Sequence, residues 1–340
     1  MKVLFIGGTG TISTEITKLM AERGNDVYLL NRGSKNHTVP ENVKILKADI
    51  YNEEESKKVI GDNSFDVVAD FIAFHKSALE RDYRLFNGKT RQFIFISSAS
   101  AYQKPPVSFP ITESTPLANP YWEYSRNKIE CEEYLVKKYR EDGFPITIVR
   151  PSHTYNDYST VIGGFEVLSR MLRGKKVIIP GDGATLWTLT NSRDFAKAFA
   201  GLCGNVHAIG DAFHITGDEV LTWNQIYQIY ADALSVKLNA VHISTDFLCD
   251  CATEDLRGSL TGDKSNNAVF DNSKIKKLVP DFCATTRFDQ GVLPCVKYFM
   301  ENKKLQDGDE KYDRWCDAVI AAQEAALLSV IKWREEQAGR

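Results

Sequence analysis

The chain has 340 residues, of which 43% are apolar, and its formal net charge is −3 at pH 7. This much apolar sequence suffices for one large core or for a core with a smaller lobe, and it excludes collagen-like, disordered and mini-protein classes. Acidic and basic residues are mixed along the chain, so no basic face for nucleic acid stands out. We expect a small neutral or anionic ligand and no nucleic-acid partner.

The cysteines and the N-terminal residues indicate the cellular compartment that we expect for the protein. The seven cysteines are spread out, and only Cys249 and Cys251 lie close together. We interpret them as reduced thiols of a cytoplasmic protein and predict no metal site, because a Cys-x-Cys pair without a second cluster lacks the usual ligand spacing. The opening "MKVLFIGG" enters an apolar strand at once, so we expect no signal peptide, and no apolar run reaches the length of a membrane span.

Short apolar runs alternate with longer helical patterns from the first residue onward. This alternation predicts β-α units in a parallel sheet. The runs are almost continuously apolar, as in strands that helices cover on both faces. The predicted strands are Val3–Ile6, Val27–Leu30, Val43–Leu46, Phe65–Ala69, Phe93–Ile96 and Ile146–Val149. The sequence therefore predicts an α/β fold with a Rossmann-type doubly wound parallel sheet.

After Arg150 the regular pattern weakens, which marks a change in organisation. The segment "GDGATLWTLTNSRDF" interrupts the alternation, and a later apolar run at Ala212–Gly217 is a candidate for one more strand of the same sheet. We expect residues 1–155 to form the first domain, with returning segments at about 190–217. Residues of about 156–189 and 218–340 would then form a smaller, woven C-terminal lobe that includes a C-terminal helix.

An apolar stripe at helical spacing lies near the C-terminus. Its members are Trp315, Val319, Ala322, Ala326, Val330 and Trp333. Because a stripe alone cannot name its partner, two interpretations stay open. The favoured one is a helix docked on its own domain, and the other is a helix that forms a homodimer.

A glycine-rich turn separates the first strand from a helix. In "FIGGTGTIS" we expect Gly7 to form the turn and Gly10 to let the backbone approach the cofactor closely. Ser13 stands where a third glycine is usual. Such a turn offers backbone N–H groups and a helix N-terminus to a pyrophosphate. We therefore predict a dinucleotide site in residues 1–155. Further cofactor contacts are expected from Thr11, Ile12, Ile50, Ile72, Ala73, Lys128 and Pro151.

The end of the second strand, "LLNRGSK", bears on the choice of cofactor. An NAD-specific site usually carries Asp or Glu there for the ribose 2′-hydroxyl, but this chain has Asn31, followed by Arg32 and Lys35. Loss of the carboxylate removes repulsion toward a 2′-phosphate, and a guanidinium can bind that phosphate through two hydrogen bonds. These residues favour NADP over NAD. Asp49, after the third strand, is a candidate for the adenine amino group or a plain turn residue.

The pattern Tyr-x-x-x-Lys occurs twice in "YSRNKIECEEYLVKK", as Tyr124 with Lys128 and as Tyr134 with Lys138. A spacing of four puts both side chains of a pair on one helix face. A buried ammonium is costly without a partner, so Lys128 is the informative residue, and we interpret the second pair, at the margin of the stripe, as a chance match. The inward stripe is predicted to contain Tyr124, Lys128, Cys131, Leu135 and Tyr139.

The fifth strand leads into "FIFISSASAY", so Ser98 emerges beyond the carboxyl end of a strand, where ligands bind in open α/β sheets. A glycine turn, a serine after the fifth strand and Tyr-x-x-x-Lys, in this order, resemble the short-chain dehydrogenase/reductase superfamily and its extended branch, the NAD-dependent epimerase/dehydratase family. The likeness covers most of the chain, through "ITESTPLANPYWEYSRNK", "IVRPSHTY", "GDGATLWTLTNSRDFAKA" and "TGDEVLTWNQIY".

By this resemblance Tyr124 is the general acid/base, Lys128 holds the nicotinamide ribose, and Ser98 hydrogen-bonds the reacting oxygen. The chemistry of these residues agrees with the roles. A phenol with a pKa of about 10 is a poor base at neutral pH and needs a positive charge beside it. A neighbouring ammonium stabilises the phenolate. The resemblance also makes the C-terminal lobe substrate-binding. Substrate contacts are implied, with less specificity, for Ser100, His153 and Arg193.

The chain departs from the family pattern at several positions. Asp70 stands where relatives often have His or Asn, and His153 stands where they often have Asn, so substrate contacts there stay open, with a structural histidine as the alternative. Ala99 and Ser100 occupy the place of the Asp-Glu pair with which the family's 4,6-dehydratases remove water. That replacement argues against dehydration and for epimerisation or carbonyl/alcohol redox chemistry.

The sequence therefore predicts a cytoplasmic NAD(P)-dependent oxidoreductase or epimerase that acts on a hydroxyl or carbonyl group. A nucleotide sugar is the family's commonest substrate. Arg193 and Arg257 are candidates for a diphosphate clamp, with surface arginines as the alternative. Another class of function is a Rossmann-fold protein retired from catalysis, which binds RNA or senses NADP, because "FDVVADF" and "SSASAY" also resemble plant stem-loop RNA-binding relatives. The acidic balance argues against RNA.

Overall fold

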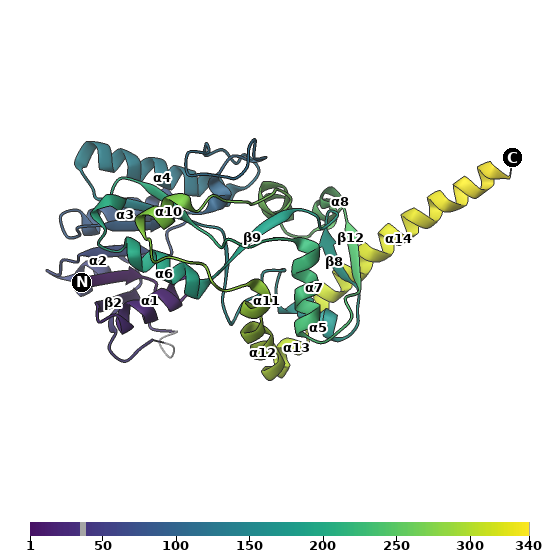
Figure 1. Ribbon diagram of the computed structural model, residues 1–340, viewed down its shortest axis with the longest axis horizontal. Coiled ribbons are helices and arrows are strands. Elements are labelled where there is room, and N and C mark those ends of the chain that lie inside the picture. Colours follow the sequence, from purple (N-terminus) through teal and green to yellow (C-terminus); the bar gives the residue numbers. More distant parts are fainter. Residues whose placement is uncertain (35–38, 340) are drawn as a thin grey trace. The chain divides into compact units, whose positions relative to one another are not determined.

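The computed structural model describes residues 1–34 and 39–339 (Figure 1). The chain forms two compact units. The first comprises Met1–Asn156, Thr188–Val220 and Ala268–Arg287, and the second comprises Asp157–Trp187, Leu221–Asn267 and Phe288–Arg340. The segment Ala268–Arg287 thus lies in the first unit, whereas the sequence analysis assigned all of residues 218–340 to the C-terminal lobe.

A seven-stranded sheet forms the centre of the first unit, in the order β10-β6-β5-β4-β1-β2-β3. Every neighbouring pair is parallel. The order reverses direction between β1 and β4, and open α/β sheets bind ligands at such a switch point. The strands are β1 (Lys2–Ile6), β2 (Asp26–Asn31), β3 (Lys44–Lys47), β4 (Val67–Asp70), β5 (Phe93–Ile96), β6 (Ile146–Pro151) and β10 (Ala212–Ile215).

Helices cover both faces of this sheet, which confirms the predicted doubly wound α/β fold. Successive strand residues point to opposite faces, so Val3 and Phe5 of β1 join one core cluster and Leu4 and Ile6 join another. The first cluster includes residues of α1 (Ser13–Glu22), α6 (Ser192–Leu202) and α10 (Ser273–Leu278). The second includes residues of α2 (Glu53–Ile60), α3 (Lys76–Phe86) and α4 (Glu123–Asp142). Burial on both faces explains why the strands are continuously apolar.

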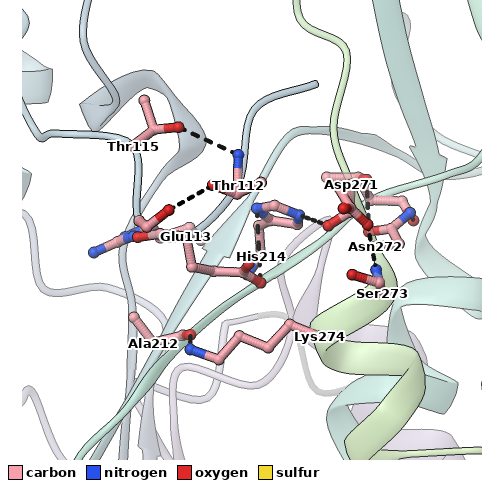
Figure 2. Close-up of polar contacts among 12 residues, drawn as sticks. Thr112, Glu113, Thr115, Ala212, His214, Asp271, Asn272, Ser273 and Lys274 are labelled. Atoms are coloured by element: carbon pink, nitrogen blue, oxygen red, sulfur yellow. Dashed lines mark hydrogen bonds and ion pairs between the residues drawn. The ribbon is translucent and has the colours of Figure 1, made fainter. Parts of the chain in front are cut away.

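The returning segment Ala268–Arg287 is held by a buried histidine of β10. His214 Nε2 donates to the main-chain carbonyl of Asp271 at 2.7 Å, and the hydroxyl of Tyr102 donates to Nδ1 at 3.1 Å. A carbonyl only accepts, so Nε2 carries the ring proton. Burial lowers the pKa of His214, which keeps the ring neutral. Figure 2 shows this contact, with the Glu113 carboxylate beside the ring.

Asn272, next in the same segment, is buried and makes a second set of hydrogen bonds. Its Nδ2 donates to the carbonyls of Thr216 and Gly217, at 3.0 and 3.1 Å, and its Oδ1 accepts from the Thr216 hydroxyl at 2.9 Å. Lys274 Nζ donates to the Ala212 carbonyl at 2.9 Å. The sequence pattern gave no sign of these bonds, because they depend on partners far away along the chain.

The remaining elements of the first unit are short, and β9 runs across the boundary between the units. Strand β7 (His153–Tyr155) pairs in parallel with β9 (Leu186–Asn191). Single 3₁₀ turns occur at η2 (Ala99–Ala101) and η3 (Val206–Ala208).

The second unit is mainly helical, with β8 (Val177–Pro180) and β12 (Ala240–Ile243) as a parallel pair. Strand β11 (Val220–Thr222) enters it at the boundary. Its other elements are α5 (Phe165–Leu172), α7 (Trp223–Ala233), α8 (Thr245–Cys251), α9 (Leu256–Ser259), the π-helical η4 (Leu260–Lys264), α11 (Phe288–Gly291), α12 (Leu293–Glu301), α13 (Lys303–Gln306) and α14 (Glu310–Ala338).

Only the first part of α14 packs against its own unit. Val319 is 4% exposed in the helix, whereas Val330 and Trp333 are each 60% exposed. The predicted stripe is therefore buried at its start and open to solvent at its end. Figure 1 draws this helix in yellow.

We predict that Asn272→Ala lowers the free energy of unfolding by about 2–3 kcal/mol, because the carbonyl of Thr216 would lose the Asn272 donor and that of Gly217 would keep only the Thr216 hydroxyl. Urea unfolding measures this change. Asn87→Ala, which removes an exposed asparagine, is the control and should change the free energy by less than about 0.5 kcal/mol. Equal effects of the two substitutions would show that Asn272 does not anchor the segment.

Candidate active site

The glycine turn after β1 forms one side of the candidate site. Gly7 has a φ of +101°, and a Cβ on it would lie 3.1 Å from Cγ2 of Ile72. The backbone of Gly7 therefore packs closely against the Ile72 side chain, which leaves little room for a larger residue at this turn. No side chain caps the start of α1, so this helix N-terminus suits an anion such as a pyrophosphate. Ser13 does not widen the turn, because its Oγ accepts from the Gly10 N–H at 2.9 Å.

A cavity of about 480 Å³ opens above this turn, and all of its lining residues belong to the first unit. It brings together most of the cofactor residues that the sequence predicted. These are Gly7, Gly10, Thr11, Ile12, Asn31, Arg32, Asp49, Ile50, Ile72, Lys128 and Pro151, with Tyr124 from the predicted catalytic set. The lining residues that the sequence analysis did not predict as cofactor contacts are Gly8, Thr9, Ser13, Leu30, Gly33, Ser34, Ala48, Tyr51, Phe71, Phe74, Ile96 and Ser97. All but Ser13, which begins α1, end a strand or lie in the turn after one, which is the signal that could have found them.

At the second strand, Asn31 ties the strand end to the glycine turn. Its Nδ2 donates to the Gly7 carbonyl at 3.4 Å, and its Oδ1 accepts from the Gly33 N–H at 2.8 Å. The amide is neutral, so no carboxylate stands at this place. Arg32 lines the cavity beside it, and Lys35 lies outside the described residues.

Asp49 lines the cavity after β3 and also shapes its own turn. Its Oδ1 accepts from the Tyr51 N–H at 3.1 Å, and its carbonyl accepts from the Ser56 hydroxyl at 3.3 Å. Asp49 is thus a turn residue that also lines the cavity, and its contact with the adenine amino group stays a prediction.

Lys128 of α4 is the buried cation of the site. Its Nζ donates to the carbonyls of Ala73 and Ile96, at 2.7 and 2.8 Å. The same Nζ lies 4.7 Å from the ring centroid of Phe74 and 4.8 Å from that of Phe95. Aromatic faces attract cations, but burial still lowers the pKa of Lys128 to about 8.

Tyr124 lies one helical turn before Lys128 and lines the same cavity. The Lys128 Nζ is 5.7 Å from the centroid of the tyrosine ring. Trp122 and Phe74 flank that ring, with centroids 4.8 and 6.2 Å away. The first Tyr-x-x-x-Lys pair thus faces the cavity as a unit.

The second pair, Tyr134 and Lys138, lies elsewhere on the helix. The Lys138 Nζ binds the carboxylate of Asp142 at 2.8 Å. Tyr139, which the sequence placed on the inward stripe, is 38% exposed. The inward face instead takes up Glu132, which is 2% exposed.

Glu132 fastens α4 to the ends of two strands. Its carboxylate accepts from Arg150 of β6 through Nε and Nη2, at 2.9 and 2.6 Å. It also accepts from the Ser97 hydroxyl at 2.5 Å. A paired, hydrogen-bonded carboxylate is tolerated in a core where a lone one is not. This pair fixes the height of α4 over the sheet, and the sequence analysis missed it.

Among the described residues, the predicted site residues Ser98, Ala73, Ser100, His153 and Arg193 do not line the cavity. Ser98 follows the lining residue Ser97, and its Oγ lies 2.8 Å from that of Ser100. The Ser125 hydroxyl, next to Tyr124, donates to Ser100 at 2.8 Å, so three hydroxyls form a chain.

The other predicted substrate residues lie on other elements. His153 lies on β7, and the Arg193 side chain, 47% exposed, is 3.9 Å from the Glu15 carboxylate. Arg257 of the second unit pairs with Asp246 and Asp250. None of these contacts singles out a diphosphate clamp among the described residues.

The second unit contains a cavity of its own, of about 620 Å³. Aromatic side chains dominate part of its wall, from Trp223, Tyr227, Tyr312 and Trp315. In the described part of the chain no helix is long and apolar enough to cross a membrane, and no group of ligating side chains could hold a metal ion.

Comparisons with known proteins agree with the fold. A model of the NAD dependent epimerase/dehydratase family matches residues 3–87 and 84–215. The 2′-dehydrokanamycin reductase of Streptomyces kanamyceticus is 23% identical over 288 residues, which are 83% of this chain and 80% of the relative. The chloroplast stem-loop binding protein of 41 kDa b of Arabidopsis thaliana is 27% identical over 247 residues, or 68% of this chain and 63% of the relative.

A solved structure supports the same fold. The UDP-glucose 4-epimerase of Thermus thermophilus, in complex with NAD, matches 88% of this chain and 99% of its own, with a TM-score of 0.69 and 18% identity. At this level of identity the likeness shows the fold alone.

We predict that Lys128→Met changes how stability depends on pH. Between pH 8 and 10.5 the folded wild type holds fewer protons on Lys128 than the unfolded chain does, so wild-type stability rises relative to the variant. The full gain is about 3 kcal/mol. Urea unfolding at several pH values measures it, with Lys137→Met, which removes an exposed lysine of the same helix, as control. Parallel curves for wild type and Lys128→Met would contradict a buried ammonium.

Proposed function

Because the chain belongs to the NAD dependent epimerase/dehydratase family, we propose that it is an NAD(P)-dependent oxidoreductase or epimerase. It acts on a hydroxyl or carbonyl group of a sugar, with a nucleotide sugar as the proposed substrate. The observation that carries this proposal is the placement of Tyr124 and Lys128 in one cavity with the glycine turn. A cofactor site and an acid-base pair within one cavity are what hydride chemistry at an alcohol carbon requires.

The chain's own groups fit a dinucleotide. The uncapped start of α1 and the turn at Gly7 suit the pyrophosphate. Asn31 and Arg32 suit the adenosine ribose, and Lys128 the nicotinamide ribose. When bound, the nicotinamide supplies the hydride acceptor and donor. NADP is the proposed preference, because Asn31 brings no negative charge toward a 2′-phosphate and Arg32 lines the cavity beside it.

Tyr124 is the proposed acid-base group. Its phenol would take the proton of a substrate hydroxyl, or return one to a carbonyl oxygen. An ammonium at Lys128, one helical turn away, favours the phenolate. Ser98 is proposed to hold the reacting oxygen, with Ser100 and Ser125 orienting its hydroxyl through the chain of bonds described above.

Two features support epimerisation or simple redox chemistry over loss of water. Ala99 and Ser100, each 5% exposed, supply no carboxyl group after Ser98. The reductase relative acts, by its name, on a dehydro compound, and the epimerase structure is named for a nucleotide sugar.

The stem-loop binding relative favours a second candidate, an RNA-binding protein without turnover. The net charge of −3 weighs against it, since RNA binding needs a basic face. Nanomolar RNA affinity in purified protein that binds neither NADH nor NADPH would reverse the order of the two candidates.

Replacing Tyr124 by phenylalanine is predicted to lower turnover by roughly 10²- to 10⁴-fold, the size of a general acid-base contribution. Cofactor affinity should stay unchanged, because the phenol is assigned to proton transfer alone. Cofactor absorbance during turnover of candidate sugars and fluorescence titration measure the two effects. Tyr134→Phe, the second Tyr-x-x-x-Lys tyrosine, is the matched control. Equal losses in both variants would remove Tyr124 from the mechanism.

Arg32→Ala tests the cofactor preference. We expect the Kd for NADPH to rise roughly 10- to 100-fold, the value of a hydrogen-bonded charge pair, and that for NADH to change little. Isothermal titration with both cofactors gives the ratio. Arg23→Ala removes an exposed arginine just outside α1 and should leave both affinities as they are. A parallel loss for both cofactors in Arg32→Ala would contradict recognition of the 2′-phosphate by Arg32.

A further inference from the structure

One buried carboxylate, that of Asp70, holds the turn that follows β4. Asp70 is 0% exposed, and its Oδ1 accepts from the N–H groups of Ile72 and Ala73, at 2.5 and 2.8 Å. The carbonyl of Ala73 then accepts from Lys128 Nζ at 2.7 Å. Ile72 lines the cofactor cavity. Asp70 therefore binds the backbone of Ile72, which lines the cavity, and the backbone of Ala73, whose carbonyl binds the Lys128 ammonium.

A second carboxyl lies beneath the first. Asp82 of α3 is also 0% exposed, and it accepts from Arg81 through Nε and Nη2, at 2.9 and 2.7 Å. The same Nη2 is 3.6 Å from Asp70 Oδ2. One guanidinium therefore serves two buried carboxyls, and two ionised carboxylates at such a place repel each other.

The unused oxygens show how this repulsion is relieved. Asp70 Oδ2 and Asp82 Oδ2 are both buried without a hydrogen-bond donor among the described residues. A proton held by Asp82 would give these two acceptors a single O–H bond. Desolvation and the neighbouring Asp70 raise the pKa of Asp82 well above its ordinary value, which agrees with a carboxyl that stays protonated.

We propose that Asp70 is the positioning residue for Lys128, and that Asp82 holds the proton that locks Asp70 in place. Asp70 then acts in two ways, by fixing the carbonyl that binds the ammonium and by placing a negative charge under it. The proposal rests on the proposed function only in so far as Lys128 takes part in catalysis.

Of the described charged groups around Lys128, Asp70 is the one whose negative charge stabilises the ammonium. On its own helix, burial raises the pKa of Cys131 to about 12, so the thiol is neutral, and Glu132 is paired with Arg150. From the sheet side, Asp70 raises the pKa of Lys128 and opposes the effect of desolvation. Tyr124 and the ring faces of Phe74 and Phe95 complete the surroundings.

Asp82→Asn tests the shared proton without removing any bond, since an amide donates to Asp70 and accepts from Arg81. A pKa raised in the folded state means that the folded wild type binds more protons than the unfolded chain above pH 3.8, so wild type loses stability as pH rises. The variant lacks this loss. Its melting temperature should therefore gain on that of wild type from about pH 4 upward. Parallel curves would overturn the shared proton.

Asp70→Asn tests the effect on Lys128, because it keeps the acceptor oxygen and removes the charge. The readout is the ¹³Cε signal of labelled lysine, and the signal that disappears in Lys128→Arg identifies residue 128. We expect wild type to titrate at about pH 8, Asp70→Asn at lower pH, and Asp82→Asn as wild type does. Glu80→Gln, an exposed carboxylate of α3, is the control. An unchanged lysine titration in Asp70→Asn would overturn the proposal.

The pH profile of turnover connects this device with activity. The alkaline limb of kcat should move to lower pH in Asp70→Asn and stay in place in Glu80→Gln, whereas a purely structural role would lower kcat evenly at all pH values. The lysine titration needs no substrate. If the lysine titration shifts in Asp70→Asn but the protein turns over no sugar, the proposed function is rejected and the positioning role is kept. If the alkaline limb of kcat does not move in Asp70→Asn, the positioning role is rejected.

Discussion

The burial of one ammonium, on Lys128, is the constraint on which the candidate site depends. A buried cation costs several kcal/mol unless its donors are used and a counter-charge is near. Here two main-chain carbonyls from different strand ends accept from Nζ, and aromatic faces surround it. Both carbonyls must be held in place. The Glu132–Arg150 pair fixes α4 over the sheet, and the Asp70 carboxylate fixes the turn after β4.

The parallel sheet explains why so many separate segments meet at this point. The carboxyl ends of parallel strands lie on one edge, so the residues that follow each strand become neighbours. The glycine turn follows β1, Asn31 ends β2, Asp49 follows β3, Ile72 follows β4 and Ser97 follows β5, and all of them line the cavity. The proposed function is thus a consequence of strand direction combined with a few side chains. The chain's membership of the NAD dependent epimerase/dehydratase family agrees with this arrangement.

The buried polar groups of the first unit include both satisfied pairs and groups that lack a hydrogen-bond partner in the described part of the chain. Glu132 with Arg150 and His214 with Tyr102 are satisfied pairs that hold segments together. The Asp70, Asp82 and Arg81 cluster differs, because two buried oxygens lack a donor. Native cores rarely leave such groups unpaired without a purpose, and here the cluster lies directly beneath the turn that binds Lys128.

Local pattern in the sequence determined the strands, the glycine turn and the choice of Tyr124 with Lys128 over Tyr134 with Lys138, because periodicity and strand ends are visible over short distances. Only the tertiary structure decided that Ala268–Arg287 belongs to the first unit, that Glu132 turns inward while Tyr139 is exposed, and that Asp70 faces Asp82. These outcomes depend on pairing between residues far apart in the chain. Such pairing follows from complementary charge and hydrogen bonding in three dimensions, which local pattern does not record.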